Sequence, residues 1–144
     1  MAGRDPKLSV IIPAYNEAGR LRHCLSDAFE YLGKQPYGWE VLVVDDGSRD
    51  QTAAVVEELA ARKPGLRLIR LLKNQGKGAA VRAGMLAAKG DVAVFSDADG
   101  STSLKEMDGF WPLFQAGLDV VIGSRALDRA RIRVRQPWYR EAMG

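Results

Sequence analysis

The stretch that decides the fold reads Val92-Ala93-Val94-Phe95-Ser96-Asp97-Ala98-Asp99, an apolar run that ends in two carboxylates. The run is continuous rather than alternating, which is typical of a strand covered on both faces. Asp97 and Asp99 lie two residues apart, and in an extended chain this spacing points both carboxylates the same way. Like charges side by side repel unless a cation bridges them. The stretch therefore predicts either a cation site or a solvated turn with two surface aspartates.

Four further apolar runs rich in β-branched residues predict strands. They are Leu8–Ile12, Val41–Val44, Leu66–Leu71 and Val120–Ile122. Helical spacing or composition fills most of the sequence between the first four strands. The expected helices are Ala18–Leu32, Asp50–Arg62 and the alanine-rich Gly78–Ala88. Strands that alternate with helices predict an α/β fold with a mainly parallel sheet flanked by helices.

Composition excludes several kinds of site. The 144 residues include 47% apolar and 27% charged residues, which suits one globular domain. Cys24 is the single cysteine and His23 the single histidine, so neither an internal disulfide nor a cysteine or histidine metal cluster can form. A metal in this chain is expected to be a hard cation held by oxygen atoms. The simplest setting is a reducing, cytoplasmic one.

The net charge of +3 is unevenly distributed along the chain. Residues 124–144 carry six arginines and a formal charge of +4, whereas residues 1–123 carry −1. An anionic partner is therefore expected at the arginine-rich tail, unless the tail is a solvated basic segment. No stretch has the roughly 20 apolar residues that span a bilayer, and residues 1–7 lack a secretory signal, so this chain is expected to be soluble.

Polar residues follow every predicted strand. The five segments are Pro13-Ala14-Tyr15-Asn16-Glu17, Asp45-Asp46-Gly47-Ser48, Lys73-Asn74-Gln75-Gly76-Lys77-Gly78, Asp97-Ala98-Asp99-Gly100-Ser101 and Gly123-Ser124-Arg125. Because the carboxyl ends of parallel strands meet at one edge, where ligands of open α/β sheets bind, these side chains are expected to converge.

Two of these segments suit a nucleoside. Tyr15 beside Glu17 could stack on a base and hydrogen-bond to it, or the pair could simply begin a helix. Asp45 could bind a base or ribose hydroxyl, while Gly47 at positive φ makes the strand-to-helix turn. The turn alone would also account for this segment.

Two basic residues suit phosphate groups. Lys77 could reach a phosphate, although the segment around it lacks the G-x-x-x-x-G-K-[ST] spacing of a P-loop. Arg125 at a strand end could bind two phosphate oxygens with its planar guanidinium, or it could form a surface salt bridge.

Together these motifs resemble the family 2 glycosyltransferases, and more narrowly the polyprenyl-phosphate glycosyltransferases, over roughly residues 8–126. The resemblance implies a GT-A fold, a nucleotide-diphospho-sugar donor, and Mg²⁺ or Mn²⁺ at Asp99, supported by Asp97. It implies catalytic roles for Asp99 and Arg125, and an acceptor phosphate held by Arg125, Arg135 and Arg140. The nucleotide-sugar site is expected to include Pro13, Tyr15, Glu17, Asp45, Asp46, Lys77, Asp97 and Ala98.

The residues after Asp99 resemble one subgroup. Gly100-Ser101-Thr102 is similar to the dolichyl-phosphate β-glucosyltransferases, as is the segment from Arg135 to Arg140. This resemblance favours UDP-glucose over GDP-mannose as donor and implies inverting transfer of a hexose to polyprenyl or dolichyl phosphate. Residues 1–126 would form the nucleotide-sugar-binding domain. Residues 127–144 would begin an acceptor-binding segment that is cut short.

Members of this family usually continue past this point with helices that meet the membrane, so the full-length protein is expected to lie peripherally on the cytoplasmic side.

Other functions remain open from the sequence. One alternative is an enzyme of the same fold that transfers the sugar to a carbohydrate acceptor. Such an enzyme would be expected to have a Glu-Asp pair as base and a Q-x-x-R-W motif, and neither is present. The chain could instead bind nucleotide-sugar without transferring it. Nucleic acid is the least favoured partner, because the acidic segments oppose it.

Overall fold

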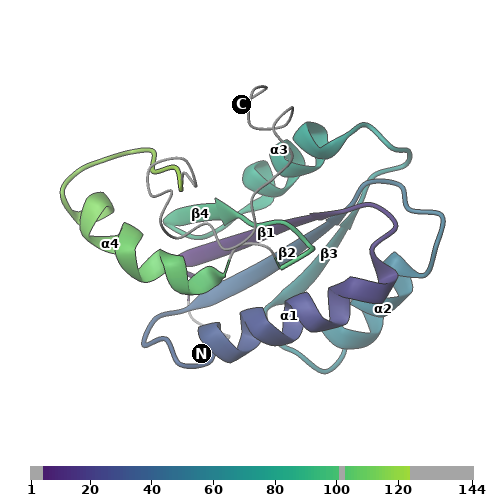
Figure 1. The fold of residues 1–144 in the computed structure, drawn as a ribbon, viewed down its shortest axis with the longest axis horizontal. Helices are drawn as coiled ribbons and strands as arrows, with labels where there is room; N and C mark the ends of the chain where they lie inside the picture. The colour runs from purple at the N-terminus through teal and green to yellow at the C-terminus, as the bar shows by residue number, and fades with distance from the viewer. Residues whose placement is uncertain (1–4, 101–102, 124–144) are drawn as a thin grey trace, which may run out of the picture. The chain divides into compact units, whose positions relative to one another are not determined.

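In the computed structural model, which describes residues 5–100 and 103–123, four parallel strands form one sheet in the order β3-β2-β1-β4 (Figure 1). The strands are β1 (Leu8–Ala14), β2 (Trp39–Asp45), β3 (Leu66–Arg70) and β4 (Val92–Phe95). Their parallel register pairs Ala14 with Asp45 and Asp45 with Arg70, so three strands end level with one another. The predicted α/β fold with a parallel sheet is confirmed.

Helices cover both faces of the sheet at its central strands. They are α1 (Ala18–Leu32), α2 (Thr52–Ala60) and α3 (Lys77–Ala87), with the short 3₁₀ helix η1 (Leu104–Glu106) after β4. In Figure 1, α3 lies on one side of the sheet and α1 and α2 lie on the other. Because both faces are covered, β1 is buried along its whole length, as its continuous apolar sequence predicts. The edge strand β4 instead alternates between half-buried and exposed residues, so the expected cover on both faces is wrong for Val92–Phe95.

The chain divides into two compact units, Met1–Glu106 and Met107–Gly144. The described part of the second unit contains α4 (Met107–Gln115), which the sequence reading missed. Apolar residues recur there at helical spacing, but Pro112 interrupts the helix and weakens the signal. The expected boundary between residues 126 and 127 lies outside the described residues and stays a prediction. No helix in the described ranges has the length and apolar character needed to cross a membrane.

The expected fifth strand at Val120–Ile122 is wrong. Residues 118–123 have no regular secondary structure, and Val120 and Ile122 are exposed. A strand needs a hydrogen-bonded neighbour, and within residues 5–100 and 103–123 this segment pairs with none. An apolar, β-branched composition favours a strand, but it does not by itself provide the neighbouring strand that pairing requires.

Helix α3 packs directly on β1 and β2. Ala80 of α3 forms a fully buried cluster with Ile11 of β1 and with Leu42 and Val44 of β2. A Cβ atom built on Gly84 would lie 2.4 Å from Ile11 Cγ2 and 3.1 Å from Val44 Cγ2. The first of these distances is shorter than real Cβ atoms show, so glycine at this position lets the helix lie directly on the sheet.

A buried carboxylate ties the strands together at their amino ends. Glu40 Oε1 accepts hydrogen bonds from Ser9 Oγ and Lys89 N, both at 2.7 Å, and Oε2 accepts one from Arg67 Nη1 at 2.8 Å. Gly90 N in turn donates to Ser9 Oγ at 2.9 Å. Burial alone would raise the pKa of Glu40, but these hydrogen bonds outweigh it and hold the pKa below its ordinary 4.5.

The packing of α3 can be tested with two glycines of the same helix. We expect Gly84→Ala to lower the free energy of unfolding by about 1–3 kcal/mol, because overpacking against Ile11 outweighs the gain in helix propensity. A Cβ on Gly78 would meet no described atom within 4 Å. Gly78→Ala should therefore leave stability unchanged or raise it slightly. Urea unfolding measures both, and equal effects of the two substitutions would contradict the close approach.

The network around Glu40 predicts a pH dependence. Because its pKa is lowered in the folded state, the stability that Glu40 contributes is present above pH 4.5 and is lost as the pH falls through the lowered pKa. Glu40→Gln should cost about 1–3 kcal/mol at pH 7 and flatten the stability curve in this acidic window. Glu106→Gln, at an exposed position of η1, serves as control. An unchanged acid limb in urea unfolding of Glu40→Gln would contradict the network's role.

Candidate nucleotide-sugar site

A cavity of about 430 Å³ lies at the carboxyl edge of the sheet. Its lining comes from the segments after β1, β2, β3 and β4, and the first turns of α1 and α3. The lining residues are Pro13, Ala14, Tyr15, Glu17, Arg20, Asp46, Asn74, Gly76, Lys77, Ala80, Asp97, Ala98 and Asp99. Four segments distant in sequence thus converge on one space, as parallel pairing predicts.

The segment after β1 is held by the segment after β2. Asn16 has a left-handed φ of 54°, its Oδ1 accepts a hydrogen bond from Arg49 N, and its own N donates to Ser48 Oγ, each at 2.9 Å. Glu17 N donates to Thr52 Oγ1 at 2.9 Å. These bonds fix the backbone at Asn16 and Glu17, while Tyr15 just before them stays 41% exposed. An exposed ring on a fixed backbone is suited to stacking.

Asp45 and Asp46 are both buried but do different things. Asp45 Oδ1 accepts a hydrogen bond from Ser48 N at 3.0 Å, and Asp45 Oδ2 lies 3.8 Å from Arg70 Nε. Among the described lining residues of the cavity Asp46 is present and Asp45 is not. Asp45 therefore makes the turn, with Gly47 at φ 71° as predicted, and its expected contact with a nucleoside stays a prediction.

Asp46 anchors the segment after β3. Its Oδ1 accepts a hydrogen bond from Gln75 N and its Oδ2 one from Gly76 N, both at 2.8 Å. A Cβ on Gly47 would lie 2.6 Å from Asn74 N, so the two segments pack backbone against backbone. The buried carboxylate thereby sets the position at which α3 begins, one residue later, at Lys77.

The expectation that Asp97 and Asp99 align in an extended chain is wrong in its geometry. β4 ends at Phe95, and Gly100 N donates to Asp97 O at 3.4 Å, which closes a turn over Asp97–Gly100. Gly100 at φ 68° completes this turn, and Ala98 within it is buried. The turn still brings both carboxylates to the cavity lining.

The acidic turn accommodates positive charge. Lys77 Nζ lies 2.5 Å from Asp97 Oδ1, with the two side chains 56% and 40% exposed. Within the described ranges no group of three or more histidine, cysteine, aspartate or glutamate side chains is placed to hold a metal. Two carboxylates completed by phosphate oxygens and water form a set that suits Mg²⁺ or Mn²⁺ better than a softer ion.

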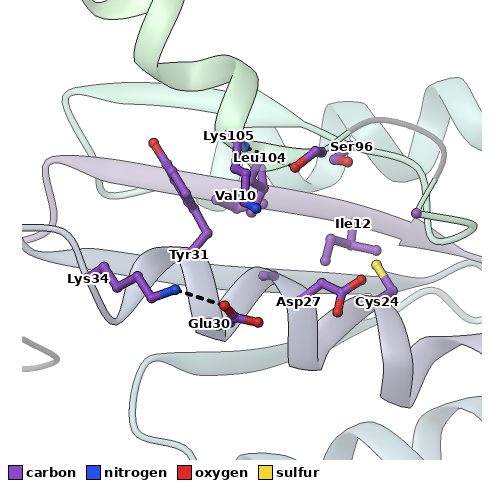
Figure 2. A pocket seen from close by; sticks show the side chains of 13 residues that line it. Val10, Ile12, Cys24, Asp27, Glu30, Tyr31, Lys34, Ser96, Leu104 and Lys105 are labelled. Atoms are coloured by element: carbon purple, nitrogen blue, oxygen red, sulfur yellow. Dashed lines mark hydrogen bonds and ion pairs between the residues drawn. The ribbon is translucent and has the colours of Figure 1, made fainter.

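A second cavity of about 310 Å³ lies between α1, β1 and the segment around η1 (Figure 2). Its floor is apolar, with Val10 and Ile12 from β1, and the Glu30 carboxylate at its rim pairs with Lys34 at 2.8 Å. Burial raises the pKa of the Cys24 thiol to about 11, and the carboxylates of Asp27, Asp99 and Glu17 raise it further. The thiol is therefore neutral at pH 7 and suits packing better than chemistry.

The structure adds two residues that the sequence reading did not assign. Arg20 lines the cavity, and its Nη1 lies 3.8 Å from Oε2 of Glu17, three residues earlier in the chain. The i,i+3 spacing of the two residues could have indicated this pairing from the sequence. Asn74 also lines the cavity, and it stood within a segment already singled out. The expected acceptor residues Arg125, Arg135 and Arg140 lie outside the described residues.

Solved structures share this fold. The mannosyltransferase PcManGT from Pyrobaculum calidifontis, in complex with GDP-Man and Mn²⁺, matches with a TM-score of 0.58 and 32% identity, over 67% of this chain and 28% of that one. Residues 1–349 of TarS from S. aureus, in complex with UDP-GlcNAc, match with a TM-score of 0.59 and 31% identity, over 76% of this chain and 32% of that one.

Curated relatives share much of the sequence. The dolichyl-phosphate beta-glucosyltransferase ALG5D of Trichomonas vaginalis is 37% identical over 147 aligned positions, which cover 95% of this chain and 45% of the relative. The Homo sapiens dolichyl-phosphate beta-glucosyltransferase is 36% identical, over 83% of this chain and 41% of the relative. The chain thus spans less than half the length of these relatives.

The sequence profile of glycosyl transferase family 2 matches residues 9–140, most of the chain. The matched range includes β1 from its second residue, the whole of β2, β3 and β4, and every segment that lines the cavity. The chain therefore belongs to glycosyl transferase family 2 and has the GT-A fold of its structural neighbours.

Proposed function

We propose that this chain is the donor-binding part of an inverting, metal-dependent hexosyltransferase that moves glucose from UDP-glucose to a polyprenyl or dolichyl phosphate. The observation that carries the proposal is the convergence of an exposed aromatic ring, a buried carboxylate, a lysine and an acidic turn on one cavity. These groups match, in order, a base, the hydroxyls or polar edge of a nucleoside, a phosphate and a divalent cation.

The nucleoside would lie beside the segment after β1. Tyr15 offers a ring for stacking, and Glu17 and Asp46 offer carboxylate oxygens to hydrogen-bond donors of the base or ribose. Pro13 belongs to the buried end of β1 and lines the same wall. Their backbone positions are fixed by bonds between the segments, so this end of the site is preorganised.

The diphosphate would lie beside Lys77 and the acidic turn. Asp97 and Asp99, beside the buried Ala98, would hold Mg²⁺ or Mn²⁺ together with donor phosphate oxygens. The bound cation would supply charge neutralisation for the departing diphosphate. Lys77 would contribute a further positive charge from the start of α3.

The transfer itself is a single displacement. An oxygen of the acceptor phosphate forms a bond to the anomeric carbon, and the bond from that carbon to the donor diphosphate breaks. The electron pair leaves with UDP, and attack from the opposite face inverts the configuration. The acceptor phosphate is already anionic and needs no general base. Arg125, Arg135 and Arg140 are proposed to orient it, which lowers the entropic part of the barrier.

The names of the curated relatives support the choice of sugar and acceptor. Relatives in Trichomonas vaginalis, Homo sapiens and Saccharomyces cerevisiae are each called dolichyl-phosphate beta-glucosyltransferase. An acceptor with a polyprenyl tail lies in a membrane, so we propose that the full-length protein acts at the cytoplasmic surface of one. The structurally similar mannosyltransferase was solved with GDP-Man, so a guanine nucleotide-sugar is the alternative donor. A binding measurement must distinguish it from UDP-glucose.

Donor preference can be measured by calorimetry. With Mg²⁺ or Mn²⁺ present we expect UDP-glucose to bind at least about tenfold more tightly than GDP-mannose, a difference of roughly 1.4 kcal/mol. EDTA should weaken UDP-glucose binding, because the diphosphate then loses its bridging cation. Preference for GDP-mannose would replace the glucosyl assignment by a mannosyl one. Failure of both nucleotides to bind in every condition would contradict the proposed function.

The acidic turn can be tested by charge removal. Asp99→Asn should weaken Mn²⁺-dependent binding of UDP by about tenfold or more and leave binding in EDTA nearly unchanged. Asp91→Asn removes the same charge just before β4, at the opposite edge of the sheet, and should change neither. The assignment would fail if Asp99→Asn bound UDP and Mn²⁺ like the unmodified chain.

A further inference from the structure

Lys77 pairs with a carboxylate that belongs to a distant part of the sheet. It follows β3, whereas Asp97 follows β4, and the order β3-β2-β1-β4 places two strands between them. The pair is nevertheless close, at 2.5 Å between Lys77 Nζ and Asp97 Oδ1. The contact exists because α3 crosses over β1 and begins near the carboxyl end of β4.

The backbone before Lys77 is held in place. Asp46 accepts hydrogen bonds from the backbone N–H groups of Gln75 and Gly76 at 2.8 Å. Gly84, two turns further along α3, lets the helix touch the sheet at Ile11. The Lys77 amine also lies 5.7 Å from the centre of the Phe95 ring, over which a cation is attracted. The position of α3, the anchoring of the preceding backbone by Asp46 and the attraction of the Phe95 ring together direct the amine to Asp97.

Lys77 and a divalent cation would compete for the same carboxylate, that of Asp97. A carboxylate already neutralised by an ammonium group 2.5 Å away attracts a second cation less strongly. A diphosphate in the cavity changes this balance, because its oxygens offer the lysine another anionic partner. With Lys77 in contact with phosphate, Asp97 would be able to join Asp99 in holding the cation.

We propose that Lys77 is a built-in counter-ion of Asp97 that disfavours metal binding until a donor diphosphate draws the amine away. Metal and nucleotide then bind with more positive coupling than their direct contact alone would give. This inference rests on the proposed function, since it assumes that the cavity takes a nucleotide diphosphate and a cation. It assigns Lys77 the role of a positioning residue that controls the order of binding, besides any contact with phosphate.

The test compares three variants of the same chain, Lys77→Met, Lys77→Arg and Lys89→Met. Lys77→Met removes the charge but keeps an unbranched side chain of similar length, and Lys77→Arg restores the charge. Lys89→Met removes the same charge just beyond the other end of α3, where the lysine side chain is exposed. The measurements are Mn²⁺ affinity by electron paramagnetic resonance, with and without saturating UDP, and UDP affinity in EDTA.

Without nucleotide, we expect Lys77→Met to bind Mn²⁺ roughly two- to fivefold more tightly than the unmodified chain, as suits a partly exposed ion pair. UDP in EDTA should bind more weakly to the same variant, and the gain in Mn²⁺ affinity caused by UDP should shrink by a similar factor. Lys77→Arg should restore all three values, and Lys89→Met should leave them unchanged. A merely structural role for Lys77 would weaken both ligands together.

Two failures can be told apart. If the unmodified chain binds both Mn²⁺ and UDP but Lys77→Met binds Mn²⁺ no more tightly, the counter-ion role is overturned and the proposed function stands. If the unmodified chain binds neither Mn²⁺ nor UDP, the proposed function falls and takes this inference with it.

Discussion

Parallel pairing of the four strands is the constraint on which the rest of this structure depends. Because every strand runs the same way, each connection to the following helix leaves from the same edge. The groups that line the cavity at this edge therefore come from four segments, and the outermost of them, Pro13 and Asp99, are 86 residues apart in sequence. The fold supplies proximity, and the side chains supply chemistry.

The two edges of the sheet use one device for different purposes. At the amino edge, Glu40 accepts a backbone hydrogen bond from Lys89 and binds the ends of neighbouring strands to each other. At the carboxyl edge, Asp46 accepts two backbone hydrogen bonds from the segment after β3. Both carboxylates are buried, and each is satisfied by donors on other strands or segments. Glu40 thus ties the strands together at one edge, whereas Asp46 positions a segment that lines the cavity at the other.

Sequence reasoning predicted β1 to β4, α1 to α3 and the edge where the polar segments converge, but not α4 and not which atoms meet at that edge. The run Leu8–Ile12 could be recognised because a strand covered on both faces is apolar at nearly every position, here at all but Ser9. Val120–Ile122 has the same composition and forms no strand, because pairing depends on a neighbour that composition does not specify. Asp45 and Asp46 are adjacent, and the local turn decides which of them reaches the cavity. The contact of Lys77 with Asp97 depends on the path of α3 over the sheet, and no spacing in the sequence encodes it.

The backbone contact at Gly47 has a consequence for anyone who wishes to redesign the pocket. A side chain there would meet the backbone at Lys73 and Asn74, so the segments after β2 and β3 pack directly against each other. Asn16 ties the segment after β1 to the segment after β2 through Ser48 and Arg49. Three walls of the cavity are therefore held to one another by direct contacts. Exchange of one segment from a relative with another donor would strain the other two, so a graft must carry all three together.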